Sequence, residues 1–541
     1  MKLRRLRIAH FKNLQNFTID FGERPFTTVV LGQNGTGKSN LLEALIIIFR
    51  DLDLGAAPAF SYTLDYECRN HEIHIEADHT RSKRAEQVQI TVRRPDGLRE
   101  RIAYNRFWQD PERTYLPSYV FGYYSGPSNR MEKHFDEHQD RFYRGQLRGE
   151  DQQRRPLFYA RSIQSQFALL AFFTEEEQAA QDSEHSTRKF LAELLGIEKL
   201  VSVLFVLHKP TWNSKEGDAR FWNARGVLGT FLAHLYELAF APMRRNVRVS
   251  PEFATTTTRE HLYLYLRNEQ ALKDLFAHYG NQREFFKALE STYISKILSA
   301  VRIRLQRRNE NGELDTLTFQ DLSEGEQQLL MVLGLLRFTR EDEALFLLDE
   351  PDTHLNPAWS IHYLEFMQRV VGEQPTSHVI MTTHDPLVIA GMQRQQVRVM
   401  RWSRQQERIT AEMPEADPQG MGVAAILTSD LFGLRSTLDT ATQDKLDRRR
   451  ELAFRDDQDL SRAEVEELNR LNHELSFIDF SITPRDPLYQ TFASEYRAFV
   501  REFVQQAGPE LKHGIVFTPE QRERQRELTR QILRKLKGQR G

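Results

Sequence analysis

Residues 32–39 read GQNGTGKS and fit the phosphate-binding pattern G-x-x-x-x-G-K-[ST]. Glycines in such a turn leave backbone N–H groups free to face a phosphate, and the N-terminus of the following helix adds positive potential. We expect Lys38 to reach the β- and γ-phosphates of a nucleotide and the Ser39 hydroxyl to bind Mg²⁺. The predicted nucleotide contacts come from six residues: Asn34, Gly35, Thr36, Gly37, Lys38 and Ser39.

Two carboxylates follow a second apolar stretch, ALFLLDE at residues 344–350. An apolar run without alternation is typical of a strand in a parallel sheet that is covered on both faces. At the end of this strand we expect Asp349 to hold Mg²⁺ through water and Glu350 to polarise an attacking water as general base. A third apolar run, residues 378–383, ends at His384, which we place within reach of the γ-phosphate.

Residues 321–328 read DLSEGEQQ and precede an apolar helix at 329–338. Ser323 and Glu326 have the spacing of a capping box, so simple helix initiation is one interpretation. In the other interpretation, Gly325 allows close approach and this helix N-terminus presents N–H donors to a phosphate.

These residues need a sheet and helices to position them. Residues 26–31 and 40–49 predict the strand and the helix on either side of the phosphate-binding turn. Residues 3–9 and 16–21 alternate apolar and polar side chains, which predicts an antiparallel sheet beside the nucleotide core. Between them, Lys12 is interpreted equally well as a nucleotide contact or as a solvated turn lysine.

Composition narrows the class of protein. The 541 residues carry a net charge of −2, so any contact with nucleic acid must be a local patch. The single cysteine, Cys68, excludes an intramolecular disulfide and suits a reducing cytoplasm. Residues 1–7 lack the apolar region of a signal peptide, and the longest apolar runs are too short to span a bilayer. We therefore expect a cytoplasmic protein without a membrane segment.

The chain is predicted to have four parts. Residues 1–130 form the first lobe of the nucleotide-binding head, 131–310 a mostly helical insertion, 311–415 the second lobe of the head, and 416–541 a helical module for docking a partner. Within the insertion, residues 302–308 alternate basic and apolar side chains, which indicates a strand. Its basic face is interpreted as solvated, with a contact to nucleic-acid phosphate as the alternative.

The order GQNGTGKS, LSEGEQQ, LLDEPD and TTHDP resembles the ABC-type ATPase heads of the SMC, RecF and OLD group. The segments FGYYSG and DEPDTHLNP, and the tail GMGVAAILTSDLFGLRSTLD from residue 420, look like the PtuA-like ATPases of Septu anti-phage systems, especially those carried with retrons. One departure is the turn at 125–129, which lacks the glutamine that many such ATPases use to sense Mg²⁺. Gln164 and Gln166 are weak candidates for that role.

The resemblance implies a fold and partners. The fold is an α/β ABC-type P-loop head, with a mixed sheet and an antiparallel N-terminal subdomain, a helical insertion and a helical C-terminal module. Two ATP molecules with Mg²⁺ are sandwiched between two subunits, so that each site takes Lys38 and Glu350 from one chain and Ser323 and Gly325 from the other. We therefore expect a homodimer or higher oligomer. The implied partners are a PtuB-like HNH nuclease and, in retron systems, a reverse transcriptase and its msDNA.

Two functions compete on the sequence. In the first, the chain is an ATPase that controls a separate nuclease in anti-phage defence. In the second, it is a DNA-repair ATPase resembling RecF or SMC, although such a protein needs no long C-terminal module. The chain itself is not expected to be a nuclease, because the LNHE string at 471–474 lies in a charged helical run without metal-ligand partners. The basic helix predicted at 519–540 is interpreted either as packing or as a nucleic-acid contact.

Overall fold

The computed structural model describes residues 1–23, 26–150, 155–175, 186–212, 216–249, 257–309, 311–338, 343–371, 376–434, 436–453 and 460–475. The chain divides into two compact units, Met1–Arg435 and Ser436–Gly541. The first unit contains the predicted nucleotide-binding residues.

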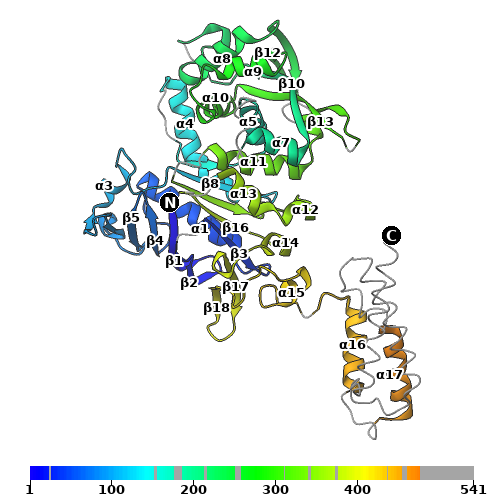
Figure 1. The fold of residues 1–541 in the computed structure, drawn as a ribbon. Helices are drawn as coiled ribbons and strands as arrows, with labels where there is room; N and C mark the ends of the chain where they lie inside the picture. Colours follow the sequence, from blue (N-terminus) through cyan, green and yellow to red (C-terminus); the bar gives the residue numbers. More distant parts are fainter. Residues whose placement is uncertain are drawn as a thin grey trace. The chain divides into compact units, whose positions relative to one another are not determined.

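A seven-stranded sheet with the order β18-β17-β3-β16-β15-β8-β9 forms the centre of the first unit (Figure 1). The strands from β17 to β9 run parallel to their neighbours, and only β18 is antiparallel. All residues of β15 and β16 are buried, as their apolar sequences predict. The strands are β3 Thr27–Gly32, β8 Tyr119–Tyr124, β9 Leu157–Tyr159, β15 Ala344–Asp349, β16 His378–Thr382, β17 Val397–Ser403 and β18 Arg408–Glu412.

Alternate residues of this sheet belong to two different cores. Phe346 and Leu348 of β15 join the core that contains the insertion and helices α11 (Glu324–Phe338) and α13 (Tyr363–Val371). Leu345 and Leu347 join the core formed with α1 (Lys38–Leu54) and the N-terminal sheet. The parallel strands are therefore covered on both faces, which explains why their sequences lack alternation.

The predicted antiparallel sheet at the N-terminus is confirmed. It has six strands in the order β2-β1-β4-β5-β6-β7, and alternating apolar residues of β1 point into its core. Its strands are β1 Lys2–Phe11, β2 Leu14–Asp20, β4 Tyr62–Cys68, β5 His71–Ala77, β6 Val88–Arg93 and β7 Arg99–Ile102, with short helices α2 Arg84–Gln87 and α3 Tyr104–Trp108 nearby in the chain.

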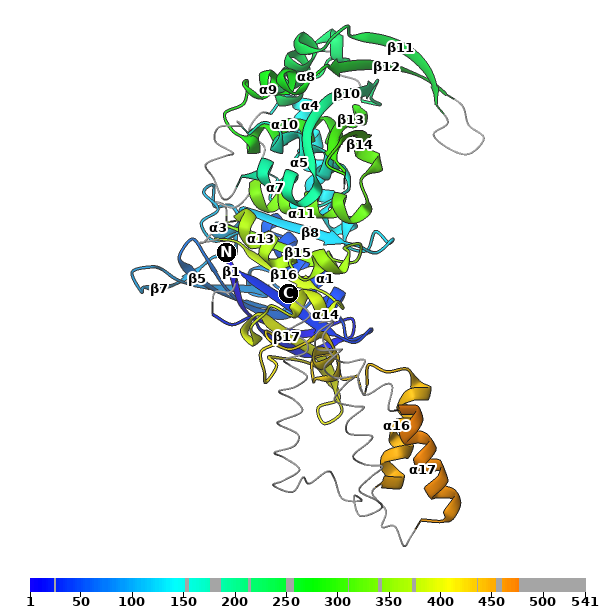
Figure 2. The same cartoon turned by 45° about the vertical axis from the view of Figure 1, so that its right-hand side comes forward.

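The insertion corrects the prediction of a mostly helical lobe. It contains a five-stranded antiparallel sheet with the order β11-β12-β10-β13-β14, and β11 and β12 extend as a long hairpin (Figure 2). The strands are β10 Ile197–His208, β11 Met243–Val249, β12 Thr257–Leu266, β13 Leu298–Arg308 and β14 Leu314–Thr318. Periodicity alone does not separate a buried strand such as β10 from a buried helix, and pairing with β12 and β13 decides its conformation.

The described part of the insertion also contains six α-helices. They are α4 Asp136–Arg148, α5 Ile163–Phe172, α7 Thr187–Leu195, α8 Gly226–Leu238, α9 Glu269–Phe276 and α10 Gln282–Ile294. Helix α10 ends at Ile294, and β13 begins at Leu298. The strand predicted at 302–308 is part of β13, whose Arg302 and Arg304 are exposed on the face opposite the core.

The second lobe of the head continues beyond the predicted boundary at residue 415. Helix α15 (Val423–Thr428) packs on the head through Ile426, and the compact unit ends at Arg435. This lobe also contains the short helices α12 (Pro357–Ser360) and α14 (Pro386–Ile389).

In the second unit, α16 (Thr440–Ala453) and α17 (Arg462–Leu475) pack through Leu446, Leu452, Leu471 and Leu475. Helices here agree with the helical module predicted for residues 416–541, whereas the helix predicted at 519–540 lies outside the described residues. In the described part of the chain, no helix combines the length and apolar character needed to cross a bilayer.

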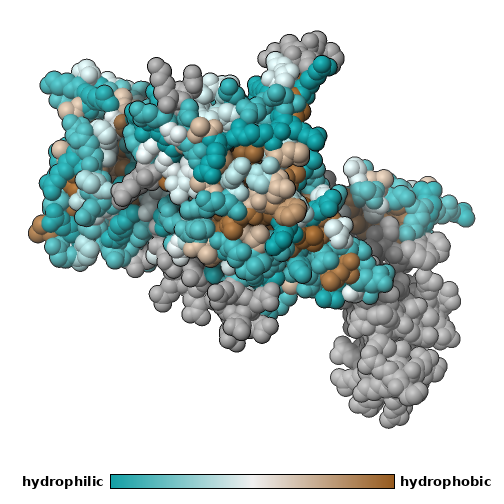
Figure 3. Space-filling view, turned by 90° about the horizontal axis from the view of Figure 1, so that it is seen from above, coloured by the Kyte–Doolittle hydropathy of each residue, from teal (hydrophilic) through white to brown (hydrophobic). Residues whose placement is uncertain are grey.

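Figure 3 shows the hydropathy of one face of the molecule. Seen from above, this face is mainly hydrophilic, and its apolar residues form only small groups (Figure 3). Hydrophobic residues scattered in this way are normal on the surface of a monomeric protein.

Candidate nucleotide-binding site

Four neighbouring parallel strands deliver the predicted site residues to one edge of the central sheet. The strands β3, β16, β15 and β8 stand side by side, so their C-terminal ends meet at this edge. The phosphate-binding turn follows β3, His384 follows β16, and Glu350 follows β15. Ligands of open α/β sheets bind at this edge, so the predicted residues lie where a nucleotide would be expected.

The phosphate-binding turn has backbone conformations that favour glycine. Gly35 and Gly37 have φ of +85° and +88°, and Gly37 is the N-cap of α1. A Cβ atom added at Gly35 would have no neighbour within 4 Å, so the space in front of this residue is open. The Thr36 hydroxyl donates to the Gln33 carbonyl at 2.7 Å and helps to fix the turn.

Lys38 is buried at the start of α1, and its Nζ donates to the Gly32 carbonyl at 2.7 Å. Burial lowers the pKa of Lys38, while the charges of Glu350 and Asp349 act in the opposite direction. The amine therefore lies on the turn itself and within the electrostatic field of the two carboxylates. It would have to leave the Gly32 carbonyl to contact a phosphate.

Asp349 is only 2% exposed at the end of β15. Its carboxylate accepts hydrogen bonds from the hydroxyls of Thr382 and Ser39. Burial raises the pKa of Asp349, although both hydrogen bonds oppose the shift. The structure thus brings together the two residues that the sequence predicted as ligands of Mg²⁺.

Glu350 and His384 form a hydrogen bond, with 2.9 Å between Oε1 and Nε2. The hydrogen bond from His384 is the main reason why the pKa of Glu350 is lowered. Glu350 also has a φ of +51°, which is strained for a residue with a side chain. Its N–H donates to the Thr382 carbonyl and lies 3.1 Å from the Thr382 hydroxyl oxygen, and these contacts hold the strained turn.

A second buried carboxylate, Asp352, lies behind this pair. Its Oδ2 accepts from the Thr383 hydroxyl at 2.5 Å, and its Oδ1 has no partner among the described residues. Burial raises the pKa of Asp352 to about 6, and the charges of Asp385 and Glu350 add to the shift. The acidic edge therefore contains three carboxylates with different environments.

Ser323 and Gly325 lie apart from this cluster. Ser323 caps α11. Its hydroxyl accepts from the Glu326 N–H at 3.2 Å, and the Glu326 carboxylate accepts from the Ser323 N–H at 2.7 Å. Gly325 fits under the His354 carbonyl, which a Cβ atom would meet at 2.4 Å. In the described part of the chain, neither residue has a hydrogen bond to the phosphate-binding turn. Ser323 is exposed, so it is free to face another molecule.

Sequence reasoning missed two threonines, Thr382 at the end of β16 and Thr383 directly after it. Thr382 connects Asp349 to Glu350, and Thr383 holds Asp352. Their position before His384 is visible in the sequence, but their partners belong to another strand. The pairing of β15 with β16 brings the threonines and the carboxylates together, and the local sequence contains no signal for this pairing.

A cluster beside the turn was also missed. Glu43 of α1 is 2% exposed and accepts from Lys12 at 2.5 Å, from Arg130 at 2.7 Å and from His134 at 3.1 Å. Burial raises the pKa of this carboxyl, but the three hydrogen bonds outweigh burial and leave it lowered. Lys12 lies in a turn and is 43% exposed, as the interpretation as a solvated turn lysine expects, and it also pairs with Glu43.

The two weak candidates for the glutamine role lie in α5, inside the insertion. Gln164 accepts from the Arg161 N–H at 2.6 Å and donates to Glu290 at 3.4 Å. These contacts hold the helix in its own lobe. Ser125 is closer to the site, because its N–H donates to the Asp349 carbonyl at 3.2 Å.

The residues present fit a nucleotide with Mg²⁺. The ligand set at the metal position consists of one hydroxyl and one carboxylate, which are the oxygen ligands that Mg²⁺ prefers. The turn offers backbone N–H groups, a helix N-terminus and the open space in front of Gly35 for phosphates. Lys38 supplies the positive charge.

Comparisons with known proteins agree with this geometry. A family model described as "AAA ATPase domain" matches residues 1–93, and one described as "AAA domain, putative AbiEii toxin, Type IV TA system" matches residues 129–390. The Septu protein PtuA of Bacillus mycoides (strain KBAB4) is 30% identical over 161 residues. This match covers 28% of this chain and 22% of that protein, so the chain spans about a fifth of the relative's length.

Among solved structures, the crystal structure of the SmcHead bound to the C-winged helix domain of ScpA covers 77% of this chain and 99% of that chain. The sequence identity is 12% and the TM-score is 0.31.

The predicted fold class, an α/β P-loop ATPase head with helical parts, is confirmed by the sheet and by the family matches. The geometry at the sheet edge and these matches together support a P-loop ATPase that is similar to PtuA over part of its length.

Proposed function

We propose that the chain is the ATP-binding and ATP-hydrolysing subunit of a Septu-type anti-phage defence complex, in which it controls a separately encoded HNH nuclease. The observation that carries the ATPase assignment is the convergence of Lys38, Asp349, Glu350 and His384 at one sheet edge. The sequence match to PtuA supports the defence assignment.

Each residue has a role that follows from its contacts. Lys38 and the N–H groups of the turn bind the phosphates, and Ser39 and Asp349 would hold Mg²⁺, which neutralises phosphate charge when bound. Glu350 stays ionised at neutral pH because its pKa is lowered by the hydrogen bond from His384. It can therefore orient the attacking water and accept its proton.

The proposal includes a homodimer in which ATP lies between two heads. The motif that contains Ser323 and Gly325 occurs once in the chain, and in the described part neither residue has a hydrogen bond to the phosphate-binding turn of its own chain. The exposed N-terminus of α11 can supply N–H donors to a nucleotide held by a second copy. ATP binding then favours closure of the dimer, and hydrolysis relaxes it.

The substitution Glu350→Gln tests this arrangement. It keeps the shape of the side chain and removes the base, so we expect ATP turnover to fall by about 10²–10⁴-fold. Bound ATP should then persist and hold the protein as a dimer, measured by size-exclusion chromatography with light scattering. Glu313→Gln, at an exposed position in the hairpin between β13 and β14, is the matched control. A Glu350→Gln protein that binds ATP and stays monomeric would contradict the shared site.

The partner is tested separately. We expect a small HNH protein to co-purify with the full chain, and to be lost when the chain ends at Arg435, because residues 436–541 form a separate unit. If the chain instead binds DNA ends or gaps and retains no nuclease, the alternative of a RecF- or SMC-like repair ATPase is favoured. The genes next to this one give the same answer at less cost.

A further inference from the structure

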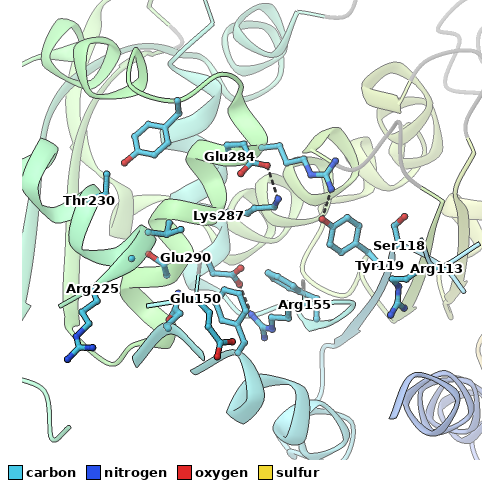
Figure 4. A pocket seen from close by; sticks show the side chains of 18 of the residues that line it. Arg113, Ser118, Tyr119, Glu150, Arg155, Arg225, Thr230, Glu284, Lys287 and Glu290 are labelled. Atoms are coloured by element: carbon cyan, nitrogen blue, oxygen red, sulfur yellow. Dashed lines mark hydrogen bonds and ion pairs between the residues drawn. The ribbon is translucent and has the colours of Figure 1, made fainter. Parts of the chain in front are cut away.

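A cavity of about 810 Å³ lies between the insertion and the start of β8 (Figure 4). Its walls come from α4, α8 and α10, from Arg155 and Phe158 at β9, and from head residues at positions 69, 112, 113, 118 and 119. The volume falls in the range of pockets that hold small organic ligands. The cavity is separate from the phosphate-binding turn, none of whose residues line it.

The cavity wall contains polar atoms that are buried without partners. Arg155 is 6% exposed and donates through one terminal nitrogen to Glu290 at 3.0 Å, while its Nε and its other terminal nitrogen have no partner in the described chain. The Tyr279 hydroxyl and the Gln146 Oε1 atom, also in the wall, are in the same condition. Buried polar groups are nearly always hydrogen-bonded, so these unsatisfied atoms in the wall of one cavity indicate a missing partner.

Charge selects the kind of partner. Six basic and four acidic side chains line the cavity, so the wall has a positive excess. The free nitrogens of Arg155 are donors, and the guanidinium group pairs best with planar or tetrahedral anions. Arg283, which donates to the Tyr119 hydroxyl at 2.6 Å, is a second guanidinium in the wall. Phe142 and Phe158 add apolar surface for an organic body.

We propose that this cavity binds a nucleotide-sized organic anion, whose phosphate or carboxylate group pairs with Arg155 and accepts from the Tyr279 hydroxyl. The ligand would lie against the wall where α10 meets β8. Tyr119 begins β8, and Tyr124 at its other end pairs in register with Asp349. An occupant would therefore brace the insertion against the strand that borders the ATPase site.

Binding can be measured with the phosphate-binding turn disabled. We would use full-length Lys38→Ala protein in EDTA and titrate it by calorimetry with pyrophosphate, AMP and citrate, which separate inorganic phosphate, nucleotide and carboxylate sources. At least one probe should bind with a Kd below about 1 mM. Because Lys38 is absent, the result does not depend on the proposed ATPase function.

Three further variants, each in the Lys38→Ala background, locate the binding. Arg155→Lys keeps the charge beside Glu290 and removes the free guanidinium nitrogens, so affinity should fall at least tenfold. Tyr279→Phe removes a hydroxyl without a partner, so it should leave the melting temperature unchanged and weaken binding about fivefold. Arg245→Gln, at an exposed position of β11, is the control and should bind like its parent. If no probe binds, or if Arg155→Lys and Tyr279→Phe both bind like the parent, the cavity holds only water and the proposal is wrong.

Discussion

The substitution Thr382→Val tests whether one buried hydroxyl holds the acidic edge of the site together. The Thr382 hydroxyl donates to Asp349 and lies 3.1 Å from the Glu350 N–H, so it links the two carboxylate residues. Valine has nearly the same shape, and the change therefore removes hydrogen bonds without creating a cavity. Thr382 is fully buried, so water cannot replace the lost hydroxyl.

The expected cost follows from the two contacts. A hydrogen bond to a charged group contributes about 1.5–3 kcal/mol and a neutral one about 0.5–1.5 kcal/mol. The Glu350 N–H keeps the Thr382 carbonyl as a partner, so the second loss is at the low end. The sum is about 2–4 kcal/mol. An unfolding entropy of about 2.1 cal/mol/K per residue, over the unit Met1–Arg435, converts this into a decrease of about 2–4 °C in melting temperature.

Function should respond more strongly than stability. Burial already raises the pKa of Asp349, and loss of the Thr382 hydrogen bond raises it further. A carboxyl group that holds its proton binds Mg²⁺ weakly, so the Mg²⁺ concentration for half-maximal ATPase activity should increase, most clearly at acidic pH. Thr382→Ser keeps the hydroxyl and serves as the matched control.

The measurements are thermal unfolding of the nucleotide-free proteins and ATPase activity across a Mg²⁺ titration. If Thr382→Val has the same melting temperature as the wild type, the hydroxyl does not stabilise the acidic edge. If Thr382→Ser loses as much stability as Thr382→Val, the methyl group and not the hydrogen bond is responsible. Either result refutes the reasoning.

Three other predictions follow from single residues. Because burial raises the pKa of Asp352 to about 6 from an ordinary value of 3.8, the folded state binds its proton more tightly than the unfolded chain, so the contribution of Asp352 to stability is full below about pH 4 and is lost, by about 3 kcal/mol, as the pH rises through 6; Asp352→Asn should remove this part of the slope in melting temperature against pH, and an unchanged slope would contradict it. Gly325→Ala should lower the melting temperature by about 1–3 °C, because the new methyl group meets the His354 carbonyl at 2.4 Å, whereas Gly391→Ala, with no neighbour within 4 Å, should not. Glu43→Gln leaves the cations Lys12 and Arg130 beside a neutral buried group and should cost about 2–4 kcal/mol, measured by the same thermal unfolding; a shift below 1 °C would show that solvent screens the cluster.

The parts of the fold that the sequence predicts are those with a strong local pattern. The turn around Lys38 and the apolar strand before Asp349 need only their own residues to be recognised, and both lie where expected. The sheet of the insertion was not predicted, because β10 is apolar on most positions and its strand conformation depends on partners far along the chain. In β10 the local sequence does not favour a strand, and the pairing with β12 and β13 decides its conformation.

The site divides in the same way. The motifs name Asp349, Glu350 and His384, but nothing in them indicates the left-handed backbone of Glu350 or the hydroxyl of Thr382 that helps to hold it. Both depend on β15 and β16 being neighbours. Sequence therefore predicts which side chains do the chemistry, whereas the structure is needed to show what keeps them in place.

The strained turn at Glu350 connects the acidic edge to the N-terminus of α11. After Glu350 the chain continues to His354, whose carbonyl covers Gly325 and whose ring lies 3.2 Å from the Glu324 carboxylate. A change in the backbone at Glu350 would therefore reach the helix end that is proposed to face a second subunit. The His354 carbonyl touches Gly325, which has no side chain. A movement of the His354 backbone would therefore act directly on the backbone of α11. On this argument, hydrolysis at one site and the fit of the neighbouring subunit are coupled through five residues of loop, and lengthening that loop should uncouple them.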